Sequence, residues 1–233
     1  MPALPLSDRA TRLWHALQVG PLWRERALAQ DAASARIAAG DDWDALEQTV
    51  AQCTACGMCA TRTQTVFGVG HPSAQWMFVG EAPGAEEDAR GEPFVGQAGR
   101  LLDAMLDAAG LGRTRQGEAG VYIANVLKCR PPGNRNPEPA EVAACSGYLQ
   151  RQIALLKPRI LVVMGRFAVQ SLLETDASIA SLRGRVHAFA RGAVRVPVIV
   201  TYHPAYLLRN LADKAKCWED LCLARRVFER SIV

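Results

Sequence analysis

Four short apolar runs, rich in β-branched residues, recur along the chain and are separated by longer segments with helical periodicity. This alternation is typical of strands joined by crossover helices. Runs without regular polar positions indicate strands of a parallel sheet that is buried on both faces. The pattern therefore predicts an α/β fold. The four runs are QWMFVG at 75–80, GVYIANVLK at 120–128, RILVVMG at 159–165 and VPVIVTYH at 196–203.

The intervening segments predict the helices that cover this sheet. Gly110 is placed to end the first helix, Pro139 suits the first position of the second, and Pro158 cannot continue it. The predicted helices span 101–109, 139–157 and 167–173, and an amphipathic helix with Cys217, Leu221, Ala224 and Phe228 on its apolar face closes the chain.

The first 45 residues contain Trp14, Trp23 and alanine-rich helical material, but no pattern that carries chemistry. We divide the chain into an N-terminal helical extension of unknown role, residues 1–45, and one domain over residues 46–233, a length that can bury a sizeable core. No window has the roughly 18 consecutive apolar residues of a membrane span, and the N-terminus lacks the features of a signal peptide. We expect a soluble, intracellular protein.

The chain has seven cysteines, an odd number that suits disulfides poorly, and a reducing cytosol disfavours disulfides as well. Cys53 and Cys56 form a close pair, and Cys129 and Cys145 form a second pair at a strand end and on the next helix. Four thiolates bind zinc or an iron–sulfur cluster, and the spacing alone does not choose between them.

The remaining cysteines have weaker claims to a metal. Cys59 extends the first pair to CTACGMC, but Thr63 occupies the place of the fourth cysteine of the ferredoxin run C-x2-C-x2-C-x3-C-P. Cys59 thus has no evident role as a ligand. Cys217 and Cys222 lie in the closing helix, where we expect them in the core.

The unusual loops of the chain follow the predicted strands, at the carboxyl ends where parallel sheets bind ligands. Residues 80–99, GEAPGAEEDARGEPFVGQAG, contain glycines that let the backbone approach a ligand, but neither a phosphate loop nor a dinucleotide fingerprint. Asn125 lies late in the second apolar run, so it either caps a loop or reads the edge of a ligand. His203 stands at the end of the fourth run, before a proline that fixes the loop.

The net charge of +4 is unevenly distributed. Residues 151–233 hold fourteen Lys and Arg against six Asp and Glu, whereas residues 1–150 hold thirteen against seventeen. A basic C-terminal half is consistent with a polyanionic partner such as nucleic acid, and equally with arginines that solvate a surface.

Several long motifs occur in an order that resembles the family-four uracil-DNA glycosylases, the iron–sulfur branch of their superfamily. The resemblance covers roughly residues 47–230 and rests on Cys53-x2-Cys56, TRTQTVFGVG, GEAPGAEEDARGEPFVGQAGRLLD, NVLKCRPPGNRNPEPAEVAAC and HPAYLLR. It implies a three-layer sandwich whose central four-stranded parallel sheet is flanked by helices, the uracil-DNA glycosylase fold. It also implies a structural 4Fe-4S cluster held by Cys53, Cys56, Cys129 and Cys145, with Cys59 a spectator.

The resemblance implies roles for the residues at the strand ends. A uracil nucleotide is extruded from DNA into a pocket beside Gly80, where Phe94 stacks on the base and Asn125 reads its edge. The amide of Asn125 complements uracil, and cytosine presents the opposite pattern of donor and acceptor. His203, with the backbone N–H groups around Glu81 and Ala82, stabilises the departing uracil anion.

Further roles concern DNA and water. Leu207, or alternatively Leu208, would wedge into the space left by the base, and Arg209 would hold a nearby phosphate. The best-known branch of the superfamily has a water-orienting aspartate where this chain has Ala82. Glu81 is our leading candidate for that role, with Glu87 and Asp88 as alternatives. The loop KCRPPGNRNPEP lacks the histidine-bearing insertion of the covalently crosslinking branch, so we expect turnover.

The resemblance thus implies a monofunctional glycosylase that hydrolyses the N-glycosidic bond of uracil in base excision repair. Its partner would be uracil-containing DNA, single- or double-stranded, and we expect a monomer in the cytoplasm, associated with the nucleoid and not with a membrane. Two alternatives are an iron–sulfur redox protein and a non-catalytic nucleic-acid-binding module associated with replication.

Overall fold

The computed structural model describes residues 42–231. Trp14, Trp23 and nearly all of the expected N-terminal extension lie outside the described residues, so the expectation of a helical extension stays a prediction. Helix α3 (Trp43–Ala51) begins inside the extension as we bounded it, so the division after residue 45 falls within a helix.

A single mixed sheet forms the centre of the described structure, with the strand order β2-β1-β3-β5-β4. The four strands expected from the apolar runs are present and pair in parallel. The strands are β1 (Trp76–Gly80), β2 (Val121–Asn125), β3 (Ile160–Met164), β4 (Val186–Arg191) and β5 (Val194–Thr201).

The expectation of a four-stranded parallel sheet was wrong in its strand count, because β4 adds a fifth, antiparallel strand beside β5. Strand β4 lies at the edge, and only Phe189 among its residues is buried. An edge strand needs no continuous apolar run, which is why the hydrophobic pattern did not reveal it. A tight turn at Gly192, whose φ of 55° favours glycine, joins β4 to β5.

Helices follow the strands as the periodicity predicted. The segment after β2 begins its helix at Pro139, and the chain leaves that helix at Lys157 in a left-handed conformation before Pro158. Cys217 is buried in the closing helix as expected, whereas Cys222 is half-buried. The remaining α-helices are α4 (Ala85–Arg90), α5 (Gln97–Ala108), α6 (Pro139–Leu156), α7 (Arg166–Leu173), α8 (Ile179–Leu182), α9 (Pro204–Leu207) and α10 (Lys214–Arg230). Short 3-10 turns are η1 (Gly57–Ala60), η2 (Gly117–Ala119), η3 (Pro132–Asn134) and η4 (Leu211–Asp213).

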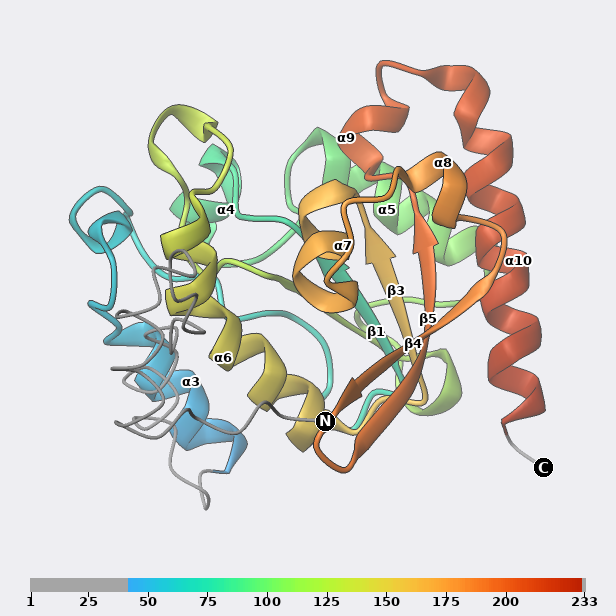
Figure 1. Cartoon of the computed structure of the whole chain (residues 1–233), viewed down its shortest axis with the longest axis horizontal. Coiled ribbons are helices and arrows are strands. Elements are labelled where there is room, and N and C mark those ends of the chain that lie inside the picture. Colours follow the sequence, from blue (N-terminus) through green and yellow to red (C-terminus); the bar gives the residue numbers. More distant parts are fainter. Residues whose placement is uncertain (1–41, 232–233) are drawn as a thin grey trace, which may run out of the picture.

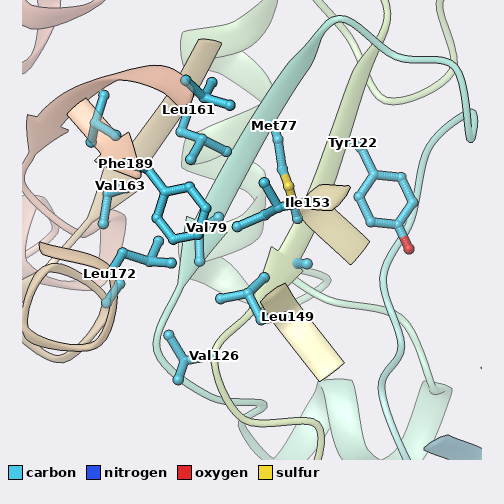
Figure 2. Packing of buried hydrophobic residues seen from close by; sticks show 14 of the residues in the cluster. Met77, Val79, Tyr122, Val126, Leu149, Ile153, Leu161, Val163, Leu172 and Phe189 are labelled. Atoms are coloured by element: carbon cyan, nitrogen blue, oxygen red, sulfur yellow. The ribbon is translucent and has the colours of Figure 1, made fainter. Parts of the chain in front are cut away.

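The two faces of the sheet bury alternate side chains of each strand, so the molecule has three layers. One face packs against α6 and α7, and the other against α5 and α10. Figure 1 shows α6 and α10 on opposite sides of the sheet, with the arrowheads of β3 and β5 pointing toward the end where α9 lies. Figure 2 shows the first face, where the labelled side chains of the strands meet Leu149 and Ile153 of α6 and Leu172 of α7.

Helix α3 packs beside α6 and brings the N-terminal end of the described chain onto the domain (Figure 1). Its Trp43 ring meets the rings of Phe67, at 5.4 Å between centroids, and Tyr122, at 4.9 Å. A third apolar cluster under this helix includes Cys129 and Cys145. In residues 42–231 no helix is both long and apolar enough to span a membrane.

Candidate functional site

The carboxyl ends of β1 and β2 meet at one edge of the sheet, where Gly80 pairs with Asn125 in the parallel register. A Cβ atom on Gly80 would lie 2.5 Å from the Asn125 Oδ1 atom and 2.6 Å from the Phe94 Cζ atom. No side chain fits there, so only glycine lets the asparagine amide and the phenylalanine ring converge. The structure thus brings together three residues that the sequence analysis placed in one pocket.

Asn125 presents an unsatisfied acceptor at this edge. The residue is 2% exposed, and its Oδ1 atom has no hydrogen-bond partner among the described residues. A buried polar atom without a partner costs about 1–3 kcal/mol, which a ligand that donates a hydrogen bond would recover. Of the two alternatives for Asn125, this geometry favours recognition of a ligand edge over the capping of a loop.

Phe94 is held in the pocket by its backbone. It is buried and has a φ of 56°, a left-handed conformation that is unusual for an aromatic residue. The Arg113 guanidinium donates hydrogen bonds to the carbonyl oxygens of Pro93, at 2.9 Å, and Phe94, at 3.0 Å. A Cβ atom on Gly99 of α5 would lie 1.8 Å from the Phe94 oxygen, so glycine is required there too. The ring therefore sits on a rigid loop.

His203 stands two residues beyond β5 and caps the N-terminus of α9. Its ring centroid lies 5.4 Å from that of Phe94, with an angle of 32° between the rings. The Nδ1 atom accepts the Ala205 backbone N–H at 3.2 Å, so the proton of the neutral ring is on Nε2. Gly165 allows this position, because a Cβ atom on it would lie 3.1 Å from the His203 Cβ atom.

The electrostatics of the pocket keep His203 neutral. Burial lowers the pKa of His203 to about 4; the Glu87 carboxylate opposes this shift and the Arg209 guanidinium adds to it. Near pH 7 the ring is therefore an uncharged donor at Nε2.

The three candidate carboxylates for positioning water have different surroundings. Glu87 accepts the backbone N–H groups of Gly84, Val95 and Gly96 at 3.0 to 3.1 Å, and so braces the loop between them. Asp88 is buried and accepts the Thr63 N–H at 3.0 Å. Glu81 is half-buried, burial raises the pKa of its carboxyl, and within residues 42–231 that group makes no side-chain hydrogen bond or ion pair. Of the three, only Glu81 has a carboxylate without a hydrogen-bond partner in the described part of the chain.

The segment that carries Glu81 runs beside the end of β2. The carbonyl oxygens of Gly80 and Glu81 accept the N–H groups of Val126 and Leu127 at 3.0 Å. Ala82 is half-buried and, like Cys53 and Cys56, packs against the apolar cluster that contains Cys129 and Cys145. The short side chain of Ala82 thus joins the pocket to the cysteine region and offers no polar group.

The two leucines after His203 differ in exposure. Leu207 is 0% exposed at the end of α9, a helix that packs against α5, so in this structure it does not reach the surface as a wedge. Leu208 is half-buried and Arg209 is exposed. Leu208, the alternative of the sequence analysis, is the more exposed of the two leucines and directly precedes Arg209.

Four cysteines line one cavity next to the pocket: Cys53, Cys56, Cys129 and Cys145. They come from the chain after α3, the start of η1, the chain after β2, and α6. Three of the sulfur atoms accept hydrogen bonds from N–H groups. The Ala55 backbone donates to Cys53 at 3.5 Å, and the Arg62 side chain donates to Cys129 at 3.1 Å. The Lys128 backbone donates to Cys145 at 3.3 Å. In the described chain Cys59 is not among the residues that line this cavity.

Burial raises the pKa of the Cys56 and Cys129 thiols and raises the pKa of Cys145 to about 12. Without a bound cation these groups would stay protonated, whereas coordination to a metal deprotonates a thiol.

The arrangement of the sulfur atoms bears on the kind of metal. Among the described residues no three His, Cys, Asp or Glu side chains converge on the position of a single ion. A zinc ion needs four donors, with sulfur at about 2.3 Å from the same atom. A 4Fe-4S cluster binds each cysteine through a different iron and so accepts sulfur atoms that stand further apart. The four cysteines around one cavity are compatible with the 4Fe-4S cluster that the resemblance implies.

Two residues of this region escaped the sequence analysis. Arg113 holds the Phe94 loop, and Lys128 is 1% exposed between the pocket and the cysteine cavity. Burial lowers the pKa of Lys128 to about 8, although the Cys145 and Cys129 thiols act in the opposite direction. Lys128 stands at the end of an apolar run, and this position was a signal that could have marked it as a functional residue. The sequence offered no such signal for Arg113.

Comparisons with known proteins agree with this geometry. The model of the Uracil DNA glycosylase superfamily matches residues 67–222. The chain is 45% identical to a type-4 uracil-DNA glycosylase of Archaeoglobus fulgidus over 71% of this chain and 82% of that protein. The chain is also 42% identical to a type-4 uracil-DNA glycosylase of Sulfurisphaera tokodaii, over 73% of this chain and 77% of that protein. It is 41% identical to a type-4 uracil-DNA glycosylase of Thermotoga maritima, over 73% of this chain and 85% of that protein. With these similarities over most of each relative, the chain belongs to the type-4 uracil-DNA glycosylases of the uracil-DNA glycosylase superfamily.

Proposed function

We propose that this protein extrudes uracil from DNA into the pocket at the ends of β1 and β2 and hydrolyses its N-glycosidic bond, which leaves an abasic site. The names of its type-4 relatives state a uracil-DNA glycosylase activity. The observation that carries the proposal is the buried Oδ1 atom of Asn125, which has no hydrogen-bond partner within residues 42–231 and lies in the pocket with Phe94 and His203.

Base selection falls to Phe94 and Asn125. A base in a duplex is out of reach of an enzyme, so the nucleotide must be rotated into the pocket, where the Phe94 ring stacks on it. The Asn125 oxygen then accepts the N3–H of uracil, and its NH2 group donates to O4. Cytosine offers an acceptor at N3 and a donor at its 4-amino group, so the same amide meets two mismatched groups.

Bond cleavage leaves negative charge on the uracil base, and His203 is the group that meets it. The neutral ring donates its Nε2–H to uracil O2, assisted by the backbone N–H groups around Glu81 and Ala82. Loss of one such preorganised donor typically costs about 100- to 1,000-fold in rate. The low pKa of His203 supports this role, because a neutral donor is present throughout the range from pH 5 to pH 9.

The Glu81 carboxylate positions the water that attacks the sugar. Ala82, at the position of the superfamily's aspartate, has no group for this purpose. Glu87 and Asp88 accept hydrogen bonds from backbone N–H groups, which supports the choice of Glu81 over these two alternatives.

Contact with DNA extends from the pocket to the chain after α9. Leu208 enters the space that the base vacates, and Arg209 holds a nearby phosphate. The exposure of Leu208 and Arg209, against the complete burial of Leu207, supports this assignment. We also propose that the protein acts as a monomer on single- or double-stranded uracil-containing DNA in the cytoplasm, in association with the nucleoid.

Cys53, Cys56, Cys129 and Cys145 would hold a 4Fe-4S cluster. When bound, the cluster supplies covalent links between the chain after α3, the chain after β2, and α6. Its role is structural, because the groups assigned to bind uracil and water all lie in the adjacent pocket.

The test uses the purified, cluster-loaded protein and an oligonucleotide with one uracil, followed by alkali and sizing of the strand. We expect alkali-dependent cleavage at uracil and none with thymine or cytosine in its place. His203→Ala should lower the single-turnover rate about 100-fold or more, whereas His71→Ala, at an exposed histidine, should not change it. If the loaded wild-type protein left uracil strands intact while still binding them, the site would be that of a binding module; intact strands with no binding would point to redox chemistry at the cluster.

A further inference from the structure

Lys128 is a charged side chain in the interior, with all of its contacts to neutral groups. Its Nζ atom donates to the Asn125 carbonyl oxygen at 2.8 Å, the Gln152 Oε1 atom at 2.6 Å and the Phe67 carbonyl oxygen at 3.3 Å. The residue is 1% exposed, follows Asn125 by three positions and directly precedes Cys129.

The hydrogen bonds of this group require the ammonium form. The Gln152 NH2 group donates to the Phe67 carbonyl oxygen at 3.0 Å and to the Tyr122 hydroxyl at 3.3 Å, so the Gln152 oxygen is the atom that faces Lys128. Three acceptors then surround the Lys128 nitrogen. A neutral amine has two N–H donors and an ammonium has three, so the geometry matches the charged form.

The charge of Lys128 has no carboxylate partner. In the described residues every ion pair involves other cations, and none reaches the Lys128 nitrogen. A buried charge is costly unless an opposite charge balances it. The residue lines the cysteine cavity, and its own backbone N–H donates to the Cys145 sulfur at 3.3 Å. Four thiolates at that cavity would provide the missing negative charge.

We propose that Lys128 is a positioning residue that links the thiolate-ligated cluster to base recognition. The negative charge of the cluster balances the buried ammonium, and the ammonium pins the carbonyl of Asn125 and with it the end of β2. The side chain of Asn125 then stays over Gly80, where its Oδ1 atom faces the base. The role in recognition rests on the proposed function; the charge balance does not.

The decisive comparison is between Lys128→Met and Arg62→Met, both cluster-loaded. Arg62 also donates to the Cys129 sulfur, at 3.1 Å, but makes no contact with Asn125 among its hydrogen bonds. Each substitution removes one positive charge beside the cluster, so both should shift its midpoint potential to more negative values in a redox titration followed by electron paramagnetic resonance. Only Lys128→Met should raise KM for a uracil oligonucleotide, by about tenfold, with Arg62→Met within twofold of the wild type. An unchanged potential in Lys128→Met would overturn the charge balance, and an unchanged KM would overturn the link to recognition.

A second measurement on the wild-type protein guards against a Lys128→Met variant that fails to fold. Amide hydrogen exchange is compared before and after oxidative removal of the cluster. We expect residues 121–128 to lose protection while β3 (160–164) keeps it. Equal protection of β2 in both forms, or equal loss across β2 and β3, would overturn the proposal. If the wild-type protein removed no uracil, the proposed function would fail, and the potentials and exchange rates would still decide the charge balance.

Discussion

The proposed uracil pocket and the cysteine cavity share the end of β2, with Asn125 in one and Cys129 in the other, yet they are built in opposite ways. The pocket depends on backbone conformation, through the absent side chain at Gly80 and the left-handed Phe94, and it leaves the Asn125 acceptor open. The cavity depends on side chains from three distant segments, and three of its sulfur atoms already accept N–H groups.

This difference indicates which region needs a bound group in order to form. The chain alone preorganises the pocket. Catalytic donors must be in place in this way before they can stabilise a transition state. The cavity brings together thiols whose pKa burial raises, and these become thiolates only with a metal. Substitutions in the cavity should therefore change stability first, and substitutions in the pocket should change turnover first.

The largest expected effect is that of Cys145→Ser. Cys145 is buried on α6, and a lost cluster link would detach the chain after α3 from it. We expect the brown colour to be lost and the free energy of unfolding to fall by about 4 kcal/mol or more, as measured by denaturant unfolding. Cys59→Ser, outside the cavity lining, is the control and should retain the cluster; an equal loss in both variants would show that the ligand set is misassigned.

Glu81→Gln tests the pocket through pH. A carboxylate that positions water must be ionised, so the rate should fall as the pH drops through the pKa of Glu81, and burial places that fall at a higher pH than for an ordinary glutamate. The variant should lose this decline at low pH and about 100-fold of the plateau rate, seen in single-turnover rates from pH 5 to pH 8, where His203 is neutral. A decline that persists in Glu81→Gln would assign it to another group.

Asn125→Ala should lower kcat/KM for uracil by about 10- to 100-fold, because the hydrogen bonds that read the base edge are lost. Its unfolding free energy should change by less than about 1 kcal/mol, since the Oδ1 atom has no partner among the described residues. Comparison of the thermal unfolding curves with the kinetics separates the two effects. A large loss of stability with unchanged turnover would reverse the contrast drawn between pocket and cavity.

The smallest effect is expected for Leu208→Ala, which should reduce kcat/KM several-fold on duplex DNA and less on single strands, where no opposite strand refills the gap. Leu207→Ala at the fully buried neighbour should instead lower the melting temperature. Glycosylase assays on matched duplex and single-stranded substrates, run below both melting temperatures, distinguish the two leucines. A duplex defect confined to Leu207→Ala would restore Leu207 as the wedge.

The apolar runs were sufficient to predict the four parallel strands and the helices that follow them, since each run had to be buried on two faces. They were insufficient for β4, whose single buried residue, Phe189, leaves no periodic signal. The pocket residues could be selected because they follow strand ends, and parallel strands end at one edge. The sequence analysis preferred Glu81 to Glu87 and Asp88, but the hydrogen bonds of the three carboxylates could not be predicted. These bonds depend on which backbone N–H groups surround each carboxylate.

The sequence by itself determined the alternation of strands and helices, the family, the positions of the cysteines and the residues at the strand ends, because periodicity and motifs are properties of the order of residues. Only the tertiary structure decided that Leu207 is fully buried whereas Leu208 is half-buried, and that the Asn125 Oδ1 atom has no hydrogen-bond partner within residues 42–231. It also decided that Lys128 lies between the pocket and the cysteines. Burial and hydrogen-bond partners depend on contacts between distant segments, and no local pattern in the chain records them.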